Sequence, residues 1–171
     1  MITMKQIKFL SGLGFIFLII AGCAKSTFKQ QEQEMIDTYI KSLGDTAYML
    51  KPSGLYYIEL EPGSGRSPVV NDTVSFWYNG MFTDRVSFNS NYTATPFIAI
   101  IGYAAKDPTS AYGIIPGLDE GLKYMKEGGK GRFLIPSSLA YGQAGIWGII
   151  PGYTPLVFEV ELNSVKSGSK K

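Results

Sequence analysis

The sequence predicts an α+β domain in which a mostly antiparallel sheet wraps around one short helix, preceded by a separate amphipathic helix. Short apolar segments with alternating polarity, separated by glycine and proline, fill residues 54–165. One helical pattern interrupts these segments near residue 118. A second and more polar helical pattern precedes them near residue 37.

The first 22 residues are typical of a bacterial export signal. Lys5 and Lys8 precede an apolar run over residues 9–21, which is short beside the roughly 20 residues that span a bilayer. The Ile-Ala-Gly-Cys sequence ending at Cys23 resembles a lipobox, whose cysteine becomes the lipidated first residue of the mature protein. The alternative, a buried core helix with an incidental cysteine, does not explain this order of features. We therefore expect a signal peptide at residues 1–22, and a lipid on Cys23 that holds the protein in the cell envelope, at the outer membrane facing the periplasm.

Residues 23–53 are expected to form a lipidated connector that contains a short amphipathic helix. Its apolar side chains recur at helical spacing, and Gly44 then provides a stop signal. These apolar side chains are Met35, Ile36, Tyr39, Ile40 and Leu43. The helix can pack on its own domain, act as a spacer from the lipid, or form a dimer, although fewer than three heptads are present for a dimer.

Three segments of the following domain, residues 54–166, alternate as strands do. In residues 156–163 the apolar side chains of one face alternate with the more polar side chains of the other. Residues 74–79 and 55–60 alternate in the same way. The inward face of the last strand is predicted to carry Leu156, Phe158, Val160 and Leu162. Residues 167–171 are expected to be a disordered tail.

The single helix of this domain is expected to begin at Pro116, because proline is favoured in the first helical turn. Asp119 and Glu120 follow near the positive end of the helix dipole, and Gly128-Gly129 stops the segment. The two carboxylates are adjacent and point in different directions, which suits a helix start better than acid–base catalysis. The expected apolar stripe is Leu118, Leu122 and Met125.

These segments follow one another in the order of a known domain. The motifs are VSFWYNGM at residues 74–81, IIPGLDEGL at 114–122, AYG at 140–142, IIP at 149–151 and LVFEVEL at 156–162. Together with shorter matches from residue 53 onward, they resemble FKBP-type peptidyl-prolyl cis-trans isomerases. With the lipobox, the chain is similar to the bacterial lipoprotein form of that family, including a branch associated with gliding motility. The resemblance implies an FKBP-like fold and isomerisation of the peptide bond before proline.

The resemblance also implies a site. The residues that match catalytic positions are Tyr78, Phe88, Asn89, Phe97, Ile115, Tyr141 and Phe158. Those that match substrate-binding positions are Ile114, Leu118 and Ile150. In the family, Leu118 would form the floor of an apolar pocket, while the Ile115 backbone N–H and the Tyr141 hydroxyl bind carbonyl groups. The partners implied are proline-containing polypeptides and, in the same pocket, a macrolide-type ligand; no cofactor and no metal are implied.

Three features depart from the family pattern. Asn89 stands where an acidic residue is usual, and Leu118 stands where tryptophan is frequent. Residues 103–113 form an insertion that could widen the site, cover it or remain a passive surface loop. Tyr141 itself is not easily explained by packing, because it precedes a glycine in a loop segment.

Composition excludes several other functions. The chain has no histidine and one cysteine, which removes serine–histidine and cysteine–histidine machinery, internal disulfides and most zinc sites. The net charge of +2 disappears when Lys5 and Lys8 leave with the signal peptide, so nucleic acid is not an expected partner. Rotation about a prolyl amide breaks no covalent bond and needs no nucleophile or metal.

Two functional hypotheses remain. The first is an exported, lipid-anchored prolyl isomerase that assists the folding of envelope proteins. The second is a weakly active or inactive binding or chaperone module of an envelope complex, because the changes at Asn89 and Leu118 could have removed most activity.

Overall fold

A computed structural model describes residues 27–103 and 113–168. The expected signal peptide, Cys23, nearly all of the insertion at 103–113 and the last three residues of the tail lie outside these ranges. Within them, no helix has the length and apolar character needed to cross a membrane.

The described residues contain seven strands that form one sheet, and every paired neighbour in it is antiparallel. The strand order is β1-β2-β6-β7-β3-β4, and β5 also pairs with β3. The strands are β1 (Met49–Leu50), β2 (Tyr56–Glu61), β3 (Thr73–Phe82), β4 (Ser87–Ser90), β5 (Phe97–Ile100), β6 (Lys130–Ile135) and β7 (Leu156–Lys166). The predicted α+β class is confirmed.

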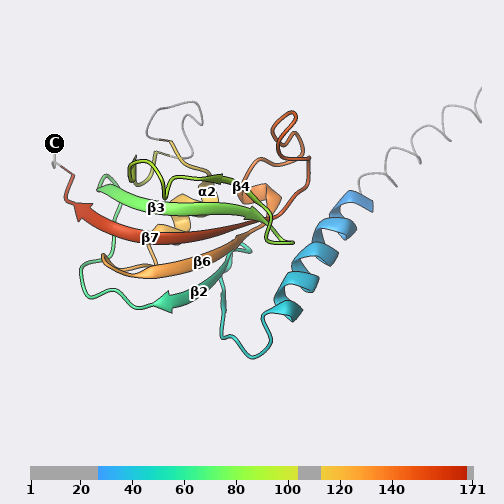
Figure 1. Cartoon of the computed structure of the whole chain (residues 1–171), viewed down its shortest axis with the longest axis horizontal. Coiled ribbons are helices and arrows are strands. Elements are labelled where there is room, and N and C mark those ends of the chain that lie inside the picture. Colours follow the sequence, from blue (N-terminus) through green and yellow to red (C-terminus); the bar gives the residue numbers. More distant parts are fainter. Residues whose placement is uncertain (1–26, 104–112, 169–171) are drawn as a thin grey trace, which may run out of the picture.

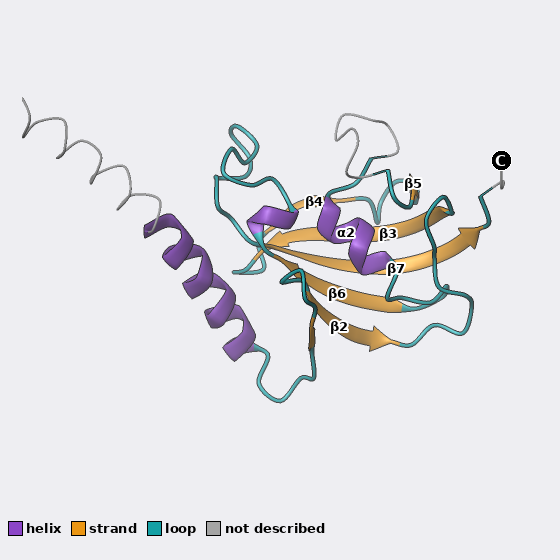
Figure 2. Ribbon diagram, turned by 180° about the vertical axis from the view of Figure 1, so that it is seen from behind, coloured by secondary structure: helices purple, strands orange, loops and turns teal. Residues whose placement is uncertain are grey.

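Helix α2 (Pro116–Leu122) lies across one face of this sheet (Figure 2). It approaches β6 closely because a glycine faces that strand: a Cβ atom on Gly121 would lie 2.7 Å from the Phe133 ring. The helix begins at Pro116 as predicted and ends at Leu122, after which single turns continue the chain. Met125, the last member of the expected stripe, therefore lies in the turn after the helix, and its side chain is buried there.

A second helix covers the opposite face of the sheet. Its described part spans residues 27–42 and lies beside the end of the sheet where β6 ends and β7 begins (Figure 1). Ile36 and Tyr39 are almost fully buried there. They pack with Met81, Leu134 and Val157, one residue from each of three neighbouring strands. The amphipathic helix expected from the sequence is present, and it packs on its own domain.

The alternation predicted for the last strand is confirmed, and β7 has a different partner on each face. Leu156 and Phe158 point into the main core under α2, whereas Val157 lies under the N-terminal helix. Near the end of the strand the register with β3 shifts by one residue, between the pairs Ser75–Ser164 and Phe76–Leu162. This bulge returns Val165 to the core face, which simple alternation does not predict.

Asp72 closes the turn before β3. Its carboxylate accepts hydrogen bonds from the backbone N–H groups of Val69 and Gly168 and forms a 2.7 Å ion pair with Arg66. The hydrogen bond from Arg66 is the largest cause that lowers the pKa of Asp72, to about 2. The turn is thus fixed by an ionised group whose side chain is only 3% exposed.

We expect the stabilising contribution of Asp72 to depend on pH. A carboxyl group whose pKa is lowered in the folded state stabilises the fold fully at pH values above its ordinary pKa of 3.8. This stabilisation is lost as the pH falls through the folded-state pKa of about 2. Asp72→Asn should lower the free energy of unfolding by about 1–2 kcal/mol at pH 6, since Arg66 is partly exposed and screened. The difference from wild type should shrink between pH 4 and pH 2. Urea unfolding measures it, and Asp45→Asn, at an exposed site, is the control; a difference that does not change with pH would contradict this account.

Candidate functional site

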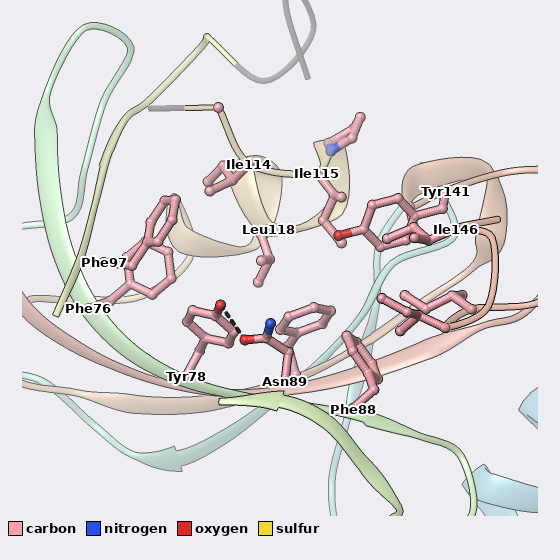
Figure 3. Close-up of a pocket in the computed structure, with 16 residues that line it drawn as sticks. Phe76, Tyr78, Phe88, Asn89, Phe97, Ile114, Ile115, Leu118, Tyr141 and Ile146 are labelled. Carbon is pink, nitrogen blue, oxygen red and sulfur yellow. Dashed lines mark hydrogen bonds between the residues drawn. The ribbon is translucent and has the colours of Figure 1, made fainter. Parts of the chain in front are cut away.

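A cavity of about 280 Å³ opens between α2, the sheet and the loop that follows β6 (Figure 3). Strands β3, β4, β5 and β7, the start of α2 and the segment 140–150 each contribute to its wall. The lining residues are Phe76, Tyr78, Phe88, Asn89, Phe97, Gly113, Ile114, Ile115, Pro116, Leu118, Ala140, Tyr141, Ile146, Ile149, Ile150 and Phe158.

Aromatic rings from four strands form one side of the cavity. The Tyr78 ring meets Phe97 edge-on at 6.2 Å between centroids, and it lies 5.9 Å from Phe158. Phe88 meets Phe158 edge-on at 5.8 Å. The Phe88 and Phe158 rings meet across β3 because Gly80 lies between them. A Cβ atom on Gly80 would come within 2.8 Å of Phe88 and 3.0 Å of Phe158. Rings locked edge-to-face in this way form a rigid apolar wall.

One hydrogen bond joins the polar groups of this wall. The Tyr78 hydroxyl donates to the Asn89 side-chain oxygen over 2.8 Å, as the dashed line in Figure 3 marks. The amide oxygen therefore accepts the hydrogen bond of the tyrosine hydroxyl as a carboxylate would, but brings no charge into the cavity. Burial raises the pKa of Tyr78 above 10.0, so its hydroxyl stays protonated at neutral pH.

The floor and one edge of the cavity come from the start of α2. Leu118 and Ile114 are more than nine-tenths buried, and both also belong to the main core. Ile115 is the N-cap of the helix, with an extended backbone (φ −59°, ψ 147°), and its carbonyl accepts the N–H groups of Leu118 and Asp119. An N-cap N–H has no partner inside its helix, so this group is available to a ligand carbonyl.

Tyr141 stands on the opposite side from Tyr78 and Asn89, and its hydroxyl points toward Ile115 (Figure 3). It follows the short 3₁₀ helix η1 (Ser137–Leu139). The Tyr141 ring is half-buried, and burial is the largest cause that raises its pKa above 10.0. The cavity thus presents a protonated hydroxyl on the side where Ile115 lies.

The structure brings together all ten residues that the sequence assigned to catalytic and substrate-binding positions, since each lines this cavity. Their roles stay predictions, and the lipidation site Cys23 lies outside the described residues. Six further residues line the cavity that were not predicted from the sequence. Phe76 could have been found, because it precedes Tyr78 by two positions on the same strand face. The other five, which no periodic pattern marks, are Gly113, Pro116, Ala140, Ile146 and Ile149.

The carboxylates of α2 lie outside the cavity and make structural contacts. Asp119 accepts hydrogen bonds from the Gly102 backbone and from Lys123, while Glu120 accepts them from Ser53 and Tyr124. Their separate directions agree with the sequence prediction. Among the described residues, no group of three acidic, cysteine or histidine side chains could hold a metal ion.

Comparison with known proteins identifies the family to which this fold belongs. A family model described as FKBP-type peptidyl-prolyl cis-trans isomerase matches residues 64–163. The chain belongs to the FKBP family. The isomerase FkpA of Escherichia coli is 42% identical to it over 120 residues, which cover 69% of this chain and 40% of FkpA. A Neisseria meningitidis FK506-binding protein is 34% identical over 113 residues, which cover 66% of this chain and 96% of the relative.

Solved FKBP structures also resemble the whole molecule. The crystal structure of Escherichia coli FkpA matches with a TM-score of 0.68 and 31% identity, covering 98% of this chain and 75% of that one. An isomerase from Pseudomonas syringae matches with the same TM-score and 27% identity, over 83% of this chain and 96% of that one. In the sequence comparison the matched segment spans only 40% of the curated FkpA relative, which is less than half of its length.

Leu118 lies both in the core and in the cavity floor, and its role in the core can be tested by measuring the free energy of unfolding. Leu118→Ala removes buried methyl groups beside an open cavity, and we expect it to lower the free energy of unfolding by about 2–3 kcal/mol. Leu60→Ala is the matched control, since that leucine on β2 is 42% exposed and should change stability by less than about 0.5 kcal/mol. Urea unfolding of both variants measures the difference; equal effects would show that Leu118 is not a core residue.

Proposed function

We propose that this FKBP is a peptidyl-prolyl cis-trans isomerase that acts on X-Pro bonds of exported proteins through non-covalent catalysis in the cavity. The observation that carries the proposal is the composition of the wall. None of the sixteen described residues that line the cavity carries a formal charge at neutral pH, and aromatic rings and aliphatic side chains dominate it. Such a site suits an uncharged prolyl ring and offers no nucleophile.

The proposed mechanism stabilises the twisted amide. Rotation about an X-Pro bond has a barrier of about 18–20 kcal/mol because amide resonance is lost halfway. With resonance lost, the amide carries less charge separation, so an apolar wall favours the twisted state over either planar isomer. Phe97, Phe158 and the Leu118 floor would hold the prolyl ring, while the Ile115 N–H and the Tyr141 hydroxyl would fix neighbouring carbonyls.

The rival proposal is a binding or chaperone module with little or no activity. Asn89 and Leu118 depart from the usual family residues at the cavity itself. Beside the cavity, the loop carrying Ile149 also bears Trp147, whose side chain is 99% exposed and thus open to a polypeptide client. This second reading keeps the cavity as a binding site for proline-containing segments.

The deciding experiment is a rate measurement. The full chain in a mild detergent should accelerate isomerisation of an X-Pro peptide, and a macrolide-type ligand of the cavity should inhibit that acceleration. No acceleration over the uncatalysed rate, together with retained binding of a proline-containing peptide, would favour the binding module instead.

A location in the envelope is a separate part of the proposal. It rests on the export signal and on the lipobox that ends at Cys23. The lipoprotein form of the family, its gliding-associated branch and the location at the outer membrane facing the periplasm rest on the same segment. Cys23→Ser should abolish lipid labelling and shift the protein out of the membrane fraction. Labelling that persists in this variant would refute the proposed lipid anchor at Cys23.

Tyr141→Phe tests the cavity independently of the overall reaction. Loss of one hydrogen bond to a ligand carbonyl should lower kcat/KM by about three- to tenfold, since such a bond contributes roughly 0.5–1.5 kcal/mol. The half-buried ring and its packing are retained, so stability should change little. Tyr92→Phe serves as the control, because its ring is 48% exposed and is absent from the cavity lining. Unchanged kcat/KM in Tyr141→Phe, in an enzyme that remains active, would place the reaction elsewhere.

Activity is expected to be independent of pH between about 5 and 9. The titratable side chains of the described wall are Tyr78 and Tyr141, and burial raises the pKa of each above 10.0, so both remain neutral throughout this range. Asn89→Asp introduces a carboxylate with an ordinary pKa of about 3.9. Its kcat/KM should change near that pH, while the wild-type profile stays flat. A wild-type inflection between pH 5 and pH 9 would indicate a catalytic group outside this wall.

A further inference from the structure

The N-terminal helix contacts the loop that carries Tyr141, although it precedes the segment that defines the family. The FKBP family model begins at residue 64, and the described part of the helix ends at residue 42. One face of the helix carries Phe28, Glu32, Ile36 and Tyr39, spaced by three or four residues. Ile36 and Tyr39 anchor this face to the sheet, which places Phe28 and Glu32 beside the loop.

Glu32 holds the start of η1 with both carboxylate oxygens. One accepts the backbone N–H of Ser137 over 2.6 Å, and the other accepts the Ser137 hydroxyl over 2.9 Å. Ser137 is 5% exposed, and the residue before it, Pro136, makes no side-chain capping bond of its own. A carboxylate from a distant helix therefore supplies the cap, and hydrogen bonds to a charged acceptor are stronger than those between neutral groups.

Ser137 in turn fixes both neighbours of Tyr141. Its carbonyl accepts the N–H of Ala140 over 2.9 Å and the N–H of Gly142 over 2.8 Å. The backbone on each side of Tyr141 is thus tied to the residue that Glu32 grips. Any shift of Ser137 is passed to the Tyr141 ring, because the two flanking peptide units move with it.

A second contact reaches the same point from the other direction. The Phe28 ring stacks on Tyr153, with centroids 5.3 Å apart and planes within 1° of parallel. The Tyr153 backbone N–H donates to the Gly142 carbonyl over 2.9 Å. Tyr153 has a left-handed backbone (φ 58°), which is unfavourable for a tyrosine and needs support from its surroundings. The helix therefore braces Gly142 along two routes, one through Ser137 and one through Tyr153.

We propose that the N-terminal helix is a working part of the active site, and that Glu32 is a positioning residue that sets the Tyr141 hydroxyl for its carbonyl. The proposal rests on the isomerase function proposed above. It follows that the activity of this chain should fall in part when the contact of Glu32 with η1 is removed. Glu32 acts only through the η1 loop, because it is not among the residues that line the cavity.

The test compares variants of the full chain in a mild detergent with an X-Pro peptide. Glu32→Ala removes both hydrogen bonds and should lower kcat/KM by about two- to fivefold, which is less than the loss in Tyr141→Phe because Glu32 acts only through that hydroxyl. Glu32→Gln keeps an acceptor for one of the two bonds and should recover part of the loss. Glu34→Ala, at an exposed position on the same helix, is the matched control and should leave kcat/KM unchanged.

Two readouts separate positioning from general stability. In the Tyr141→Phe background the effect of Glu32→Ala should largely disappear, because Glu32 would have no hydroxyl left to position. Backbone amide exchange should accelerate at Ala140 and Gly142 in Glu32→Ala, while Phe133 and Val160 in the sheet keep their wild-type rates. Additive losses in the double variant, or faster exchange throughout the sheet, would overturn the proposal. If Glu32→Ala does not fold, the same comparisons apply to Glu32→Gln.

The experiment distinguishes this inference from the proposed function. An inactive wild-type protein would refute the isomerase, and amide exchange at Ala140 and Gly142 would still show whether Glu32 holds the loop. An active wild-type protein with an unchanged Glu32→Ala variant would refute the positioning role alone.

Discussion

The pairing of β7 with β3 on one side and β6 on the other is the constraint on which the rest of the structure depends. It places alternate side chains of one long strand in two different cores. Phe158 points toward α2 and the cavity, whereas its neighbour Val157 lies under the N-terminal helix. A shift of one residue in this register would exchange the two faces, so cavity wall and helix docking surface are fixed together.

The cavity is defined by its lack of charge as much as by its shape. Its described wall is apolar apart from two protonated tyrosines, one asparagine and backbone groups. Asn89 keeps the hydrogen bond of Tyr78 without placing an anion in the cavity wall. Such a wall would lower the barrier of a reaction that is limited by loss of amide resonance, because the twisted amide is less polar than either planar isomer. The absence of histidine from the chain is compatible with this chemistry.

The site also extends beyond the segment shared with the family. The loop after β6 carries Tyr141 and is held partly by its own backbone hydrogen bonds, such as those that the Ser137 carbonyl accepts from Ala140 and Gly142. Glu32 and Phe28 provide two further contacts from the N-terminal helix. In a protein tethered at the front of the chain, the element nearest the proposed anchor would then also shape the catalytic loop.

The sequence by itself determined the class of fold, the main strands and the start of α2, because strand alternation and the Pro116 signal are local patterns. Its resemblance to FKBP motifs also named ten residues that the fold gathers around one cavity. Other features were decided only by tertiary structure. Ile146 and Ile149 reach the cavity because the Ile146–Ile150 pairing folds an irregular loop back on itself. The polar helix residue Glu32 becomes the cap of η1 through a contact that spans 105 positions of the chain. No periodicity marks such a contact, since it exists only once two separately folded segments have packed on the same end of the sheet.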